Sequence, residues 1–294
     1  MRKKYRLTYN LLAVTARYVR SLSVANRERL AQRLAGVVFH YFPIRKDIAL
    51  RNLRRAFPAY SSNRRQTILK YCYLSYIRNF LQFFALPDSY RRAPITINGK
   101  NLLDTALREG KGVLLIAGHF GSWEILAAWL GYNRYPFVGV AQRQKNRGAD
   151  KFFRELRERS GIRHIFRKAS LDKMYAVLKN GEILGLASDQ DARKRGVFVK
   201  FFDQPASTPK GAAMFHLRQG APMLFISCYE TKPYQYVIDI EPIPVKRGDD
   251  VTAITQQFTS LLEKKVRQYP SQYFWFHRRW KTKINESGSG RKQP

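Results

Sequence analysis

The stretch that decides the fold is Gly112 to Gly131, GVLLIAGHFGSWEILAAWLG. Its first half, Val113 to Ala117, is a short apolar run rich in branched residues, which is typical of a buried strand. Ser122 is a suitable N-cap residue, and the apolar spacing beyond it predicts a helix over 122–130. His119 therefore lies where a strand gives way to a helix. Open α/β sheets hold reactive groups at this place, the carboxyl ends of their strands.

Strand and helix patterns alternate from this stretch to the end of the chain. We expect strands at 94–98, 113–117, 136–141, 163–166, 183–188, 222–229 and 234–241, and helices at 102–108, 122–130, 150–159, 171–179, 209–219 and 250–268. The helix expected at 209–219 would be capped by Thr208 and begin with Pro209. The alternation predicts an α/β fold, with a mostly parallel sheet flanked by helices.

A basic helical section precedes the alternating part, with helices expected at 5–19, 27–42, 46–57 and 64–86. Leu7, Leu11, Val14 and Tyr18 form an apolar stripe on the first helix, flanked by basic residues. The stripe fits a helix that lies in a bilayer interface or one that packs on the core. The fourth helix is apolar nearly all round, so it is either buried or faces lipid.

We therefore divide the chain into three parts. Residues 1–90 form a helical, membrane-associating section, residues 91–284 form the α/β core, and residues 285–294 form a disordered tail.

The net charge of +33 in 294 residues indicates a polyanionic partner. Nucleic acid, an anionic membrane, a phosphorylated substrate and an acidic protein all fit this charge. Residues 1–60 carry 14 Lys or Arg against two acids. Because the sequence has no long uncharged apolar run, we expect no conventional spanning helix, and the N-terminus does not fit a cleaved signal peptide. Cys72 and Cys228 lie in apolar stretches, so we expect buried free thiols and a reducing compartment.

Glu124 follows His119 at a spacing of five residues. On one helix this spacing would place the two side chains about 140° apart. They can meet only if His119 precedes the helix and Glu124 lies in its first turn. A carboxylate on one ring nitrogen would fix the tautomer while the other nitrogen takes a proton from a hydroxyl. The alternative is a packed histidine and a surface glutamate, but the strand–glycine–helix context favours chemistry.

His119 and Glu124 form an H-x-x-x-x-[D/E] motif that resembles the motif of glycerolipid-type acyltransferases. Three further segments resemble one branch of that group, the late acyltransferases of lipid A biosynthesis (lauroyl and myristoyl transferases). They are RNLRRAFP at 51–58, the block SDQDARKRGVFVKFFDQPASTPKGAAMFHLRQGAP at 188–222, and WFHRRWKT at 275–282. The segments lie in the family's order and cover roughly residues 45–283.

The resemblance implies an O-acyltransferase that acts on a lipid A precursor at the cytoplasmic face of the inner membrane, as a peripheral or monotopic protein. His119, oriented by Glu124, would deprotonate the acceptor hydroxyl, which then attacks an acyl thioester carried on acyl carrier protein. Backbone N–H groups of the glycine-flanked turn and Arg143 would stabilise the oxyanion. No metal and no cofactor are implied, and no cluster of metal-ligating residues is evident.

Several residues are candidates for binding substrate. Asp189, Gln190 and Asp191 follow an expected strand. The paired carboxylates could bind a metal or act as a second acid–base pair, but the resemblance favours a block that shapes the rim of the site, with Asp191 the one to touch substrate. Phe198 and Phe202, with Phe201, would line an acyl channel or belong to the core. Lys210 would bind phosphate at a helix N-terminus, and Arg278 and Arg279 would bind the phosphate of the acceptor.

Two alternative functions remain open at this point. The same chemistry could act on another glycolipid or an aminolipid. A basic nucleic-acid-binding protein would also explain the charge, but no recognised nucleic-acid motif supports it, and we expect no nucleic-acid partner.

Overall fold

The computed structural model describes residues 2–166 and 170–284, so the tail expected at 285–294 lies outside the described residues. Its helices are α1 (Lys3–Ser21), α2 (Val24–Tyr41), α3 (Lys46–Ala56), α4 (Ser62–Phe84), α5 (Asp88–Arg91), α6 (Lys100–Arg108), α7 (Trp123–Tyr132), α8 (Arg147–Glu158), α9 (Leu171–Lys179), α10 (Gly211–Gln219) and α11 (Val251–Gln268). Its strands are β1 (Ile95–Asn98), β2 (Val113–Ala117), β3 (Phe137–Ala141), β4 (Arg163–Phe166), β5 (Ile183–Ala187), β6 (Val197–Phe201), β7 (Gln204–Thr208), β8 (Met223–Lys232) and β9 (Gln235–Pro242).

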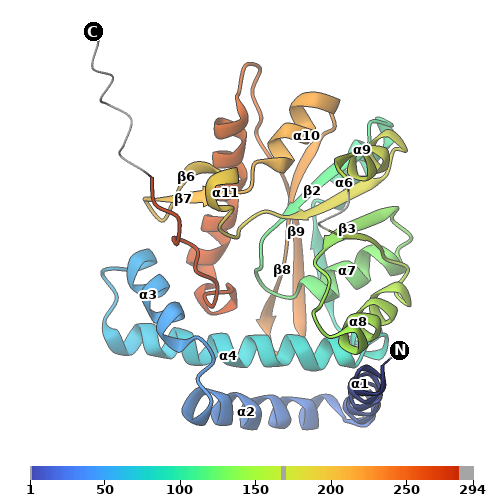
Figure 1. Ribbon diagram of the computed structural model, residues 1–294, viewed down its shortest axis with the longest axis vertical. Coiled ribbons are helices and arrows are strands. Elements are labelled where there is room, and N and C mark those ends of the chain that lie inside the picture. Colours follow the sequence, from blue (N-terminus) through green and yellow to red (C-terminus); the bar gives the residue numbers. More distant parts are fainter. Residues whose placement is uncertain (1, 167–169, 285–294) are drawn as a thin grey trace.

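The central sheet has seven strands in the order β1-β9-β8-β2-β5-β3-β4 (Figure 1). Every neighbouring pair is parallel except β8 and β9, which form an antiparallel hairpin. The prediction of a mostly parallel α/β sheet flanked by helices is confirmed. The strand β5 lies between β2 and β3, so the carboxyl ends of these three strands lie side by side at one edge of the sheet.

Helices cover both faces of the sheet because successive side chains of each strand point to opposite sides. Leu114 and Ile116 of β2 belong to a core cluster shared with α9, α10 and α11. Val113 and Leu115 belong to a second cluster shared with α6, α7 and α8. Both cysteines are buried free thiols, as predicted, one in each cluster.

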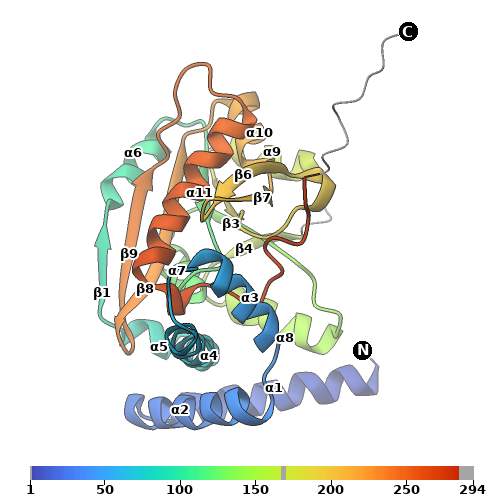
Figure 2. The same ribbon diagram turned by 90° about the vertical axis from the view of Figure 1, so that its left-hand side faces the viewer.

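The helix α4 runs past the end of the sheet to which the β8 arrow points, and α2 lies beside α4 (Figure 1). Figure 2 shows α4 end-on, between α2 and the sheet. Arg78 of α4 is paired with Glu28 of α2, with 2.7 Å between Nε and Oε2. Of the two predicted alternatives for α4, burial is therefore the one observed. Tyr71 and Phe80 are its exposed large apolar side chains.

The apolar stripe of α1 points away from the protein. Leu7, Leu11, Val14 and Tyr18 are 72%, 64%, 59% and 57% exposed. The opposite face of α1 packs on α8, where a Cβ on Gly148 would lie only 2.0 Å from the Tyr5 carbonyl oxygen. The stripe is therefore not the face that packs on the core. Within the described residues, no helix combines the length and apolarity needed to span a membrane.

The hairpin of β6 and β7 was not predicted from the sequence. Its turn holds Phe202 and Asp203 at φ values of 53° and 58°, a conformation that hairpin turns usually assign to Asn or Gly. The backbone N–H of Phe202 donates to Glu263 Oε2 at 2.6 Å. The expected cap at Thr208 is also wrong, because Thr208 ends β7 and the N-cap of α10 is Lys210.

Candidate active site

His119 and Asp189 meet at the carboxyl ends of β2 and β5. These strands are parallel neighbours in which Ala117 is opposite Ala187, so each functional residue lies two positions beyond the last pair. His119 Nδ1 is 2.7 Å from Asp189 Oδ1. The strand register therefore creates a histidine–carboxylate pair between residues 70 positions apart in the sequence.

The two side chains differ in their access to solvent. The His119 side chain is 31% exposed, whereas that of Asp189 is 3% exposed. His119 Nε2 lies 3.4 Å from the amide nitrogen of Gln190, and the rings of Trp123 and Phe274 flank the imidazole. Asp189 thus lies at Nδ1 of a partly exposed imidazole, and Nε2, the other ring nitrogen, lies beside Gln190.

The electrostatics couple the pair. Burial lowers the pKa of His119, but the charge of Asp189 and its hydrogen bond raise it, and the net shift is upward from 6.5. Burial raises the pKa of Asp189, but the charge and hydrogen bond of His119 lower it, and the net shift is downward from 3.8. Asp189 is therefore ionised at neutral pH. An ionised carboxylate on Nδ1 fixes the proton there and leaves Nε2 able to accept one.

The predicted contact between His119 and Glu124 is wrong, and Asp189 takes the expected place of Glu124. His119 does precede α7 and Glu124 does lie in its first turn. However, both carboxylate oxygens of Glu124 accept hydrogen bonds from Arg157 of α8, with 2.9 Å between Arg157 Nε and Oε2. Glu124 thus joins α7 to α8. The strand order that brings β5 beside β2 is invisible in the spacing of a local motif.

Two backbone N–H groups at the end of this turn already have partners. Gly121 N–H donates to the Gln272 carbonyl oxygen at 2.8 Å, and Ser122 N–H donates to that of Cys228 at 2.7 Å. These bonds fix the turn after β2 against the C-terminal segment and β8. These two N–H groups are therefore engaged in this structure. Backbone oxyanion donors elsewhere in the turn, such as the N–H groups of His119 and Phe120, stay a prediction.

The helix α4 holds the turn from its other side. Tyr76 OH donates to the His119 carbonyl oxygen at 3.1 Å. Asn79 Nδ2 donates to the Gly121 carbonyl oxygen at 2.8 Å, and Asn79 Oδ1 accepts from the Ser122 hydroxyl. Neither Tyr76 nor Asn79 stood out in the sequence, because they lie in a helix that reads only as apolar. The N-terminal section is thus part of the construction of the site.

Gly121 is the position in this turn that tolerates no side chain. Its φ is +61°, and a Cβ there would lie 1.9 Å from the Cys228 carbonyl oxygen. We expect Gly121→Ala to lower the free energy of unfolding by about 2 kcal/mol or more, measured by urea denaturation. Gly110→Ala is the matched control, because Gly110 has φ +71° but open space around its Cβ. Equal losses in the two variants would contradict the role of the close approach.

The remaining candidates lie in different surroundings. Arg143 is exposed in the loop after β3, with its guanidinium 4.2 Å from the centre of the Phe166 ring. Lys210 is exposed at the N-terminus of α10. Phe198 is half-buried on β6. Phe202 is 3% exposed and packs on Phe57, so it belongs to the core, one of the two predicted alternatives.

Asp191, Arg278 and Arg279, the remaining predicted substrate-binding residues, also lie in different surroundings. The carboxylate of Asp191 accepts from the backbone N–H and the hydroxyl of Thr282, at 2.9 and 2.8 Å, so it fastens the C-terminal segment. Arg278 is exposed. Arg279 is 2% exposed and donates to the Ser207 carbonyl oxygen at 2.7 Å, so it cannot reach an acceptor phosphate at the surface. Its prediction as a phosphate ligand is wrong in this structure.

A mostly parallel α/β sheet with a histidine–carboxylate pair at the carboxyl ends of its strands has the groups that general-base catalysis needs. Comparison with known proteins gives the family. The model of the bacterial lipid A biosynthesis acyltransferases matches residues 2–282. The chain therefore belongs to this family, and it is an acyltransferase, as the resemblance of its motifs implied.

Individual relatives are distant. The chain is 27% identical over 266 residues to the lipid A biosynthesis palmitoleoyltransferase of Escherichia coli (strain K12), covering 88% of this chain and 86% of that protein. It is 27% identical over 263 residues to the lipid A biosynthesis lauroyltransferase of the same strain, covering 87% and 85%. It is also 26% identical over 223 residues to the phosphatidylinositol mannoside acyltransferase of Mycobacterium tuberculosis (strain CDC 1551 / Oshkosh), covering 72% and 70%.

Proposed function

We propose that this protein is an O-acyltransferase that moves a fatty acyl chain from an acyl thioester on acyl carrier protein to a hydroxyl of a lipid A precursor. The observation that carries the proposal is the contact of 2.7 Å between His119 Nδ1 and Asp189 Oδ1, in a member of an acyltransferase family. The general base is His119, and the carboxylate that orients it is Asp189.

The reaction follows from the protonation states of this pair. Neutral His119 takes the proton of the acceptor hydroxyl on Nε2 while the hydroxyl oxygen attacks the thioester carbonyl carbon. The tetrahedral intermediate then collapses, the carbon–sulfur bond breaks, and the proton on Nε2 passes to the departing thiolate. The products are the ester and the free thiol. Arg143 remains our candidate for the oxyanion donor, because it follows β3, the neighbour of β5 in the sheet.

The acceptor has two candidates. Two of the relatives described above are named for lipid A biosynthesis, and one is named for phosphatidylinositol mannoside. The net charge of +33 favours an acceptor with several phosphates, and we therefore propose a lipid A precursor first. A phosphoinositide glycolipid, with a single phosphodiester, is the second candidate.

The test is a transfer assay with purified protein and defined donors. The assay combines lauroyl and palmitoyl chains on carrier protein or coenzyme A with either a phosphorylated lipid A precursor or a mannosylated phosphoinositide. Mass spectrometry of the lipid then reports the added chain. We expect transfer to the lipid A precursor from the carrier-protein donor. Transfer to the mannosylated lipid alone would favour the second acceptor, and no transfer to either would refute the proposal.

We also propose that the protein acts at the cytoplasmic face of the inner membrane, held there by α1. The exposed apolar stripe of α1 is flanked by exposed basic residues, among them Arg6 and Arg17. An amphipathic helix of this kind lies in the plane of the interface, with its apolar side among the acyl chains and its basic side on lipid phosphates. Lys210, Arg278 and the basic helix α3 are further candidates for phosphate contacts.

The double variant Leu11→Glu/Val14→Glu is expected to weaken binding to vesicles that contain phosphatidylglycerol. Each lost apolar side chain should lower the partition constant by about tenfold, since burying such a side chain contributes about 1.5–3 kcal/mol. Cosedimentation with vesicles measures the effect. The matched control is Leu217→Glu on α10, a leucine that is 51% exposed outside this stripe. Equal loss of binding in the control would contradict the assignment to α1.

A further inference from the structure

Arg279 is the most deeply buried arginine near the active site. It lies in the C-terminal segment, and its exposed fraction is 2%. Its guanidinium donates to the Ser207 carbonyl oxygen at 2.7 Å and to the Thr208 hydroxyl at 2.5 Å, and it lies 5.3 Å from the centre of the Phe201 ring. Its Nε has no hydrogen-bond partner among the described residues. A guanidinium keeps its charge in proteins, so a buried one requires a counter-ion.

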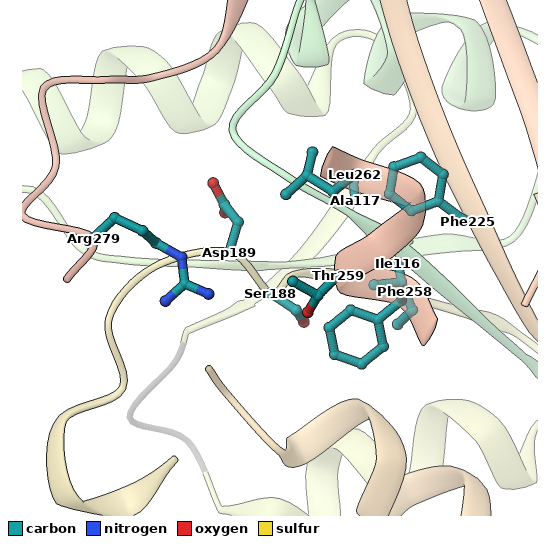
Figure 3. A pocket seen from close by; sticks show the side chains of 9 residues that line it. All are labelled: Ile116, Ala117, Ser188, Asp189, Phe225, Phe258, Thr259, Leu262 and Arg279. Atoms are coloured by element: carbon teal, nitrogen blue, oxygen red, sulfur yellow. The ribbon is translucent and has the colours of Figure 1, made fainter. Parts of the chain in front are cut away.

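Asp189, which is paired directly with His119, is the buried carboxylate whose charge acts on Arg279 from the same cavity, without a direct ion pair between Arg279 and Asp189 among the described residues. Arg279 and Asp189 line the same small cavity, together with Ser188 and apolar residues of β2, β8 and α11. Figure 3 shows the two charged side chains at the same end of this cavity, while the phenylalanine and leucine side chains occupy the other end. Asp191 is also near Arg279, but its carboxylate is bound to Thr282.

The other titratable groups that face Asp189 are neutral at pH 7. Tyr76 of α4 and Tyr273 of the C-terminal segment have pKa values raised well above 10 by burial. Burial lowers the pKa of His277 below 6.5. His119 itself titrates. Arg279 is therefore the permanent cation among the described groups that face Asp189.

We propose that Arg279 is a positioning residue whose buried positive charge keeps Asp189 ionised and tempers the proton affinity of the His119–Asp189 pair. The proposal rests on the general-base role of His119 given above. Asp189 draws a proton onto the imidazole, and a cation behind Asp189 opposes that effect. Arg279 thus leaves His119 free of the extra proton at neutral pH, in the state that can act as a base.

Removing the charge should have an effect of known sign. In the wild type, protonating His119 places a positive imidazolium near the positive guanidinium of Arg279. Without Arg279 this repulsion is absent, so protonation of the pair becomes more favourable. The apparent pKa of the pair therefore rises. As the pH falls, the active neutral imidazole is then protonated at a higher pH than in the wild type. A shift of about one unit would be ordinary for a neighbouring buried charge.

The test is a pH titration of the His119 ring, followed in ¹H–¹⁵N spectra of protein labelled on its five histidines. The His119 signal is assigned by its absence in His119→Ala. Arg279→Gln should raise the His119 midpoint by about one unit, whereas Arg279→Lys, which keeps the charge, should leave it near the wild-type value. Thr208→Val removes one partner of Arg279 and keeps the charge, so its melting temperature should fall without a shift in the midpoint.

An unchanged midpoint in Arg279→Gln, or equal shifts in the Gln and Lys variants, would overturn the proposal. If Arg279→Gln does not fold, citrulline introduced at position 279 by peptide ligation removes the charge and nearly preserves the shape, with the same expected shift. The titration needs no turnover. A failure of the transfer assay would therefore refute the proposed function, whereas an unchanged midpoint would refute the role of Arg279 alone.

Discussion

His119→Ala is expected to lower kcat for acyl transfer by about 10⁴-fold or more, because the variant has no group to take the proton of the acceptor hydroxyl. Stability should change little, since the His119 side chain is 31% exposed and the turn is held through backbone groups. The transfer assay gives kcat, and thermal melting gives the stability. Loss of activity at an unchanged melting temperature is the expected combination.

His40→Ala is the matched control, because His40 is an exposed histidine at the end of α2. It should keep wild-type activity. Transfer by His119→Ala at a rate near that of the wild type would refute general-base catalysis by this residue. Loss of activity in both variants would indicate a general effect of losing a histidine rather than chemistry at His119.

The wild-type pH profile carries a related expectation. Asp189 raises the pKa of His119 above 6.5, against the opposing effect of burial. The midpoint for protonation of this base therefore lies above pH 6.5. Activity should therefore fall as the pH decreases through a midpoint above 6.5.

Local patterns in the sequence were sufficient to predict most of the fold. The strand Val113–Ala117 was predicted at its observed bounds because an apolar run is closed on both sides by glycines. Gly161, Gly181 and Gly220, each just beyond an expected helix, likewise marked the ends of α8, α9 and α10. The hairpin of β6 and β7 escaped because Phe202, at positive φ, takes the turn position usually held by Asn, Asp or Gly, and Asp203 alone did not mark the reversal.

The active site was only half predictable, and strand order explains the difference. His119 and its position before α7 follow from local signals. Asp189 was recognised as following a strand, but the sequence does not state that β5 pairs with β2. Burial was equally hidden, because WFHRRWKT contains two adjacent arginines of which Arg278 is exposed and Arg279 is inside. Composition alone suggested phosphate ligands for both.

The second large effect is expected for Asp189→Asn, which should lower kcat by about 10⁴-fold. An amide in place of the carboxylate no longer holds the proton on Nδ1 and cannot stabilise the imidazolium. The pKa of His119 should also fall, because the largest influence that raises it is the charge of Asp189. The acidic limb of the pH profile should therefore move to lower pH while the remaining activity is small. The pH dependence of kcat/KM measures both effects.

Glu124→Gln distinguishes this assignment from the one that the motif suggested. Glu124 is bound to Arg157, so the substitution removes the negative charge that faces that guanidinium and one of its two acceptor oxygens, and it should lower the free energy of unfolding by about 1–3 kcal/mol. The acidic limb should stay where it is in the wild type, because Asp189 still orients the imidazole. If Glu124→Gln instead moved the limb and Asp189→Asn did not, Glu124 would be the carboxylate that orients His119 during catalysis. The shift of the limb, and not the loss of rate, is therefore the decisive measurement, since a loosened α7 could slow the reaction without touching the protonation of His119.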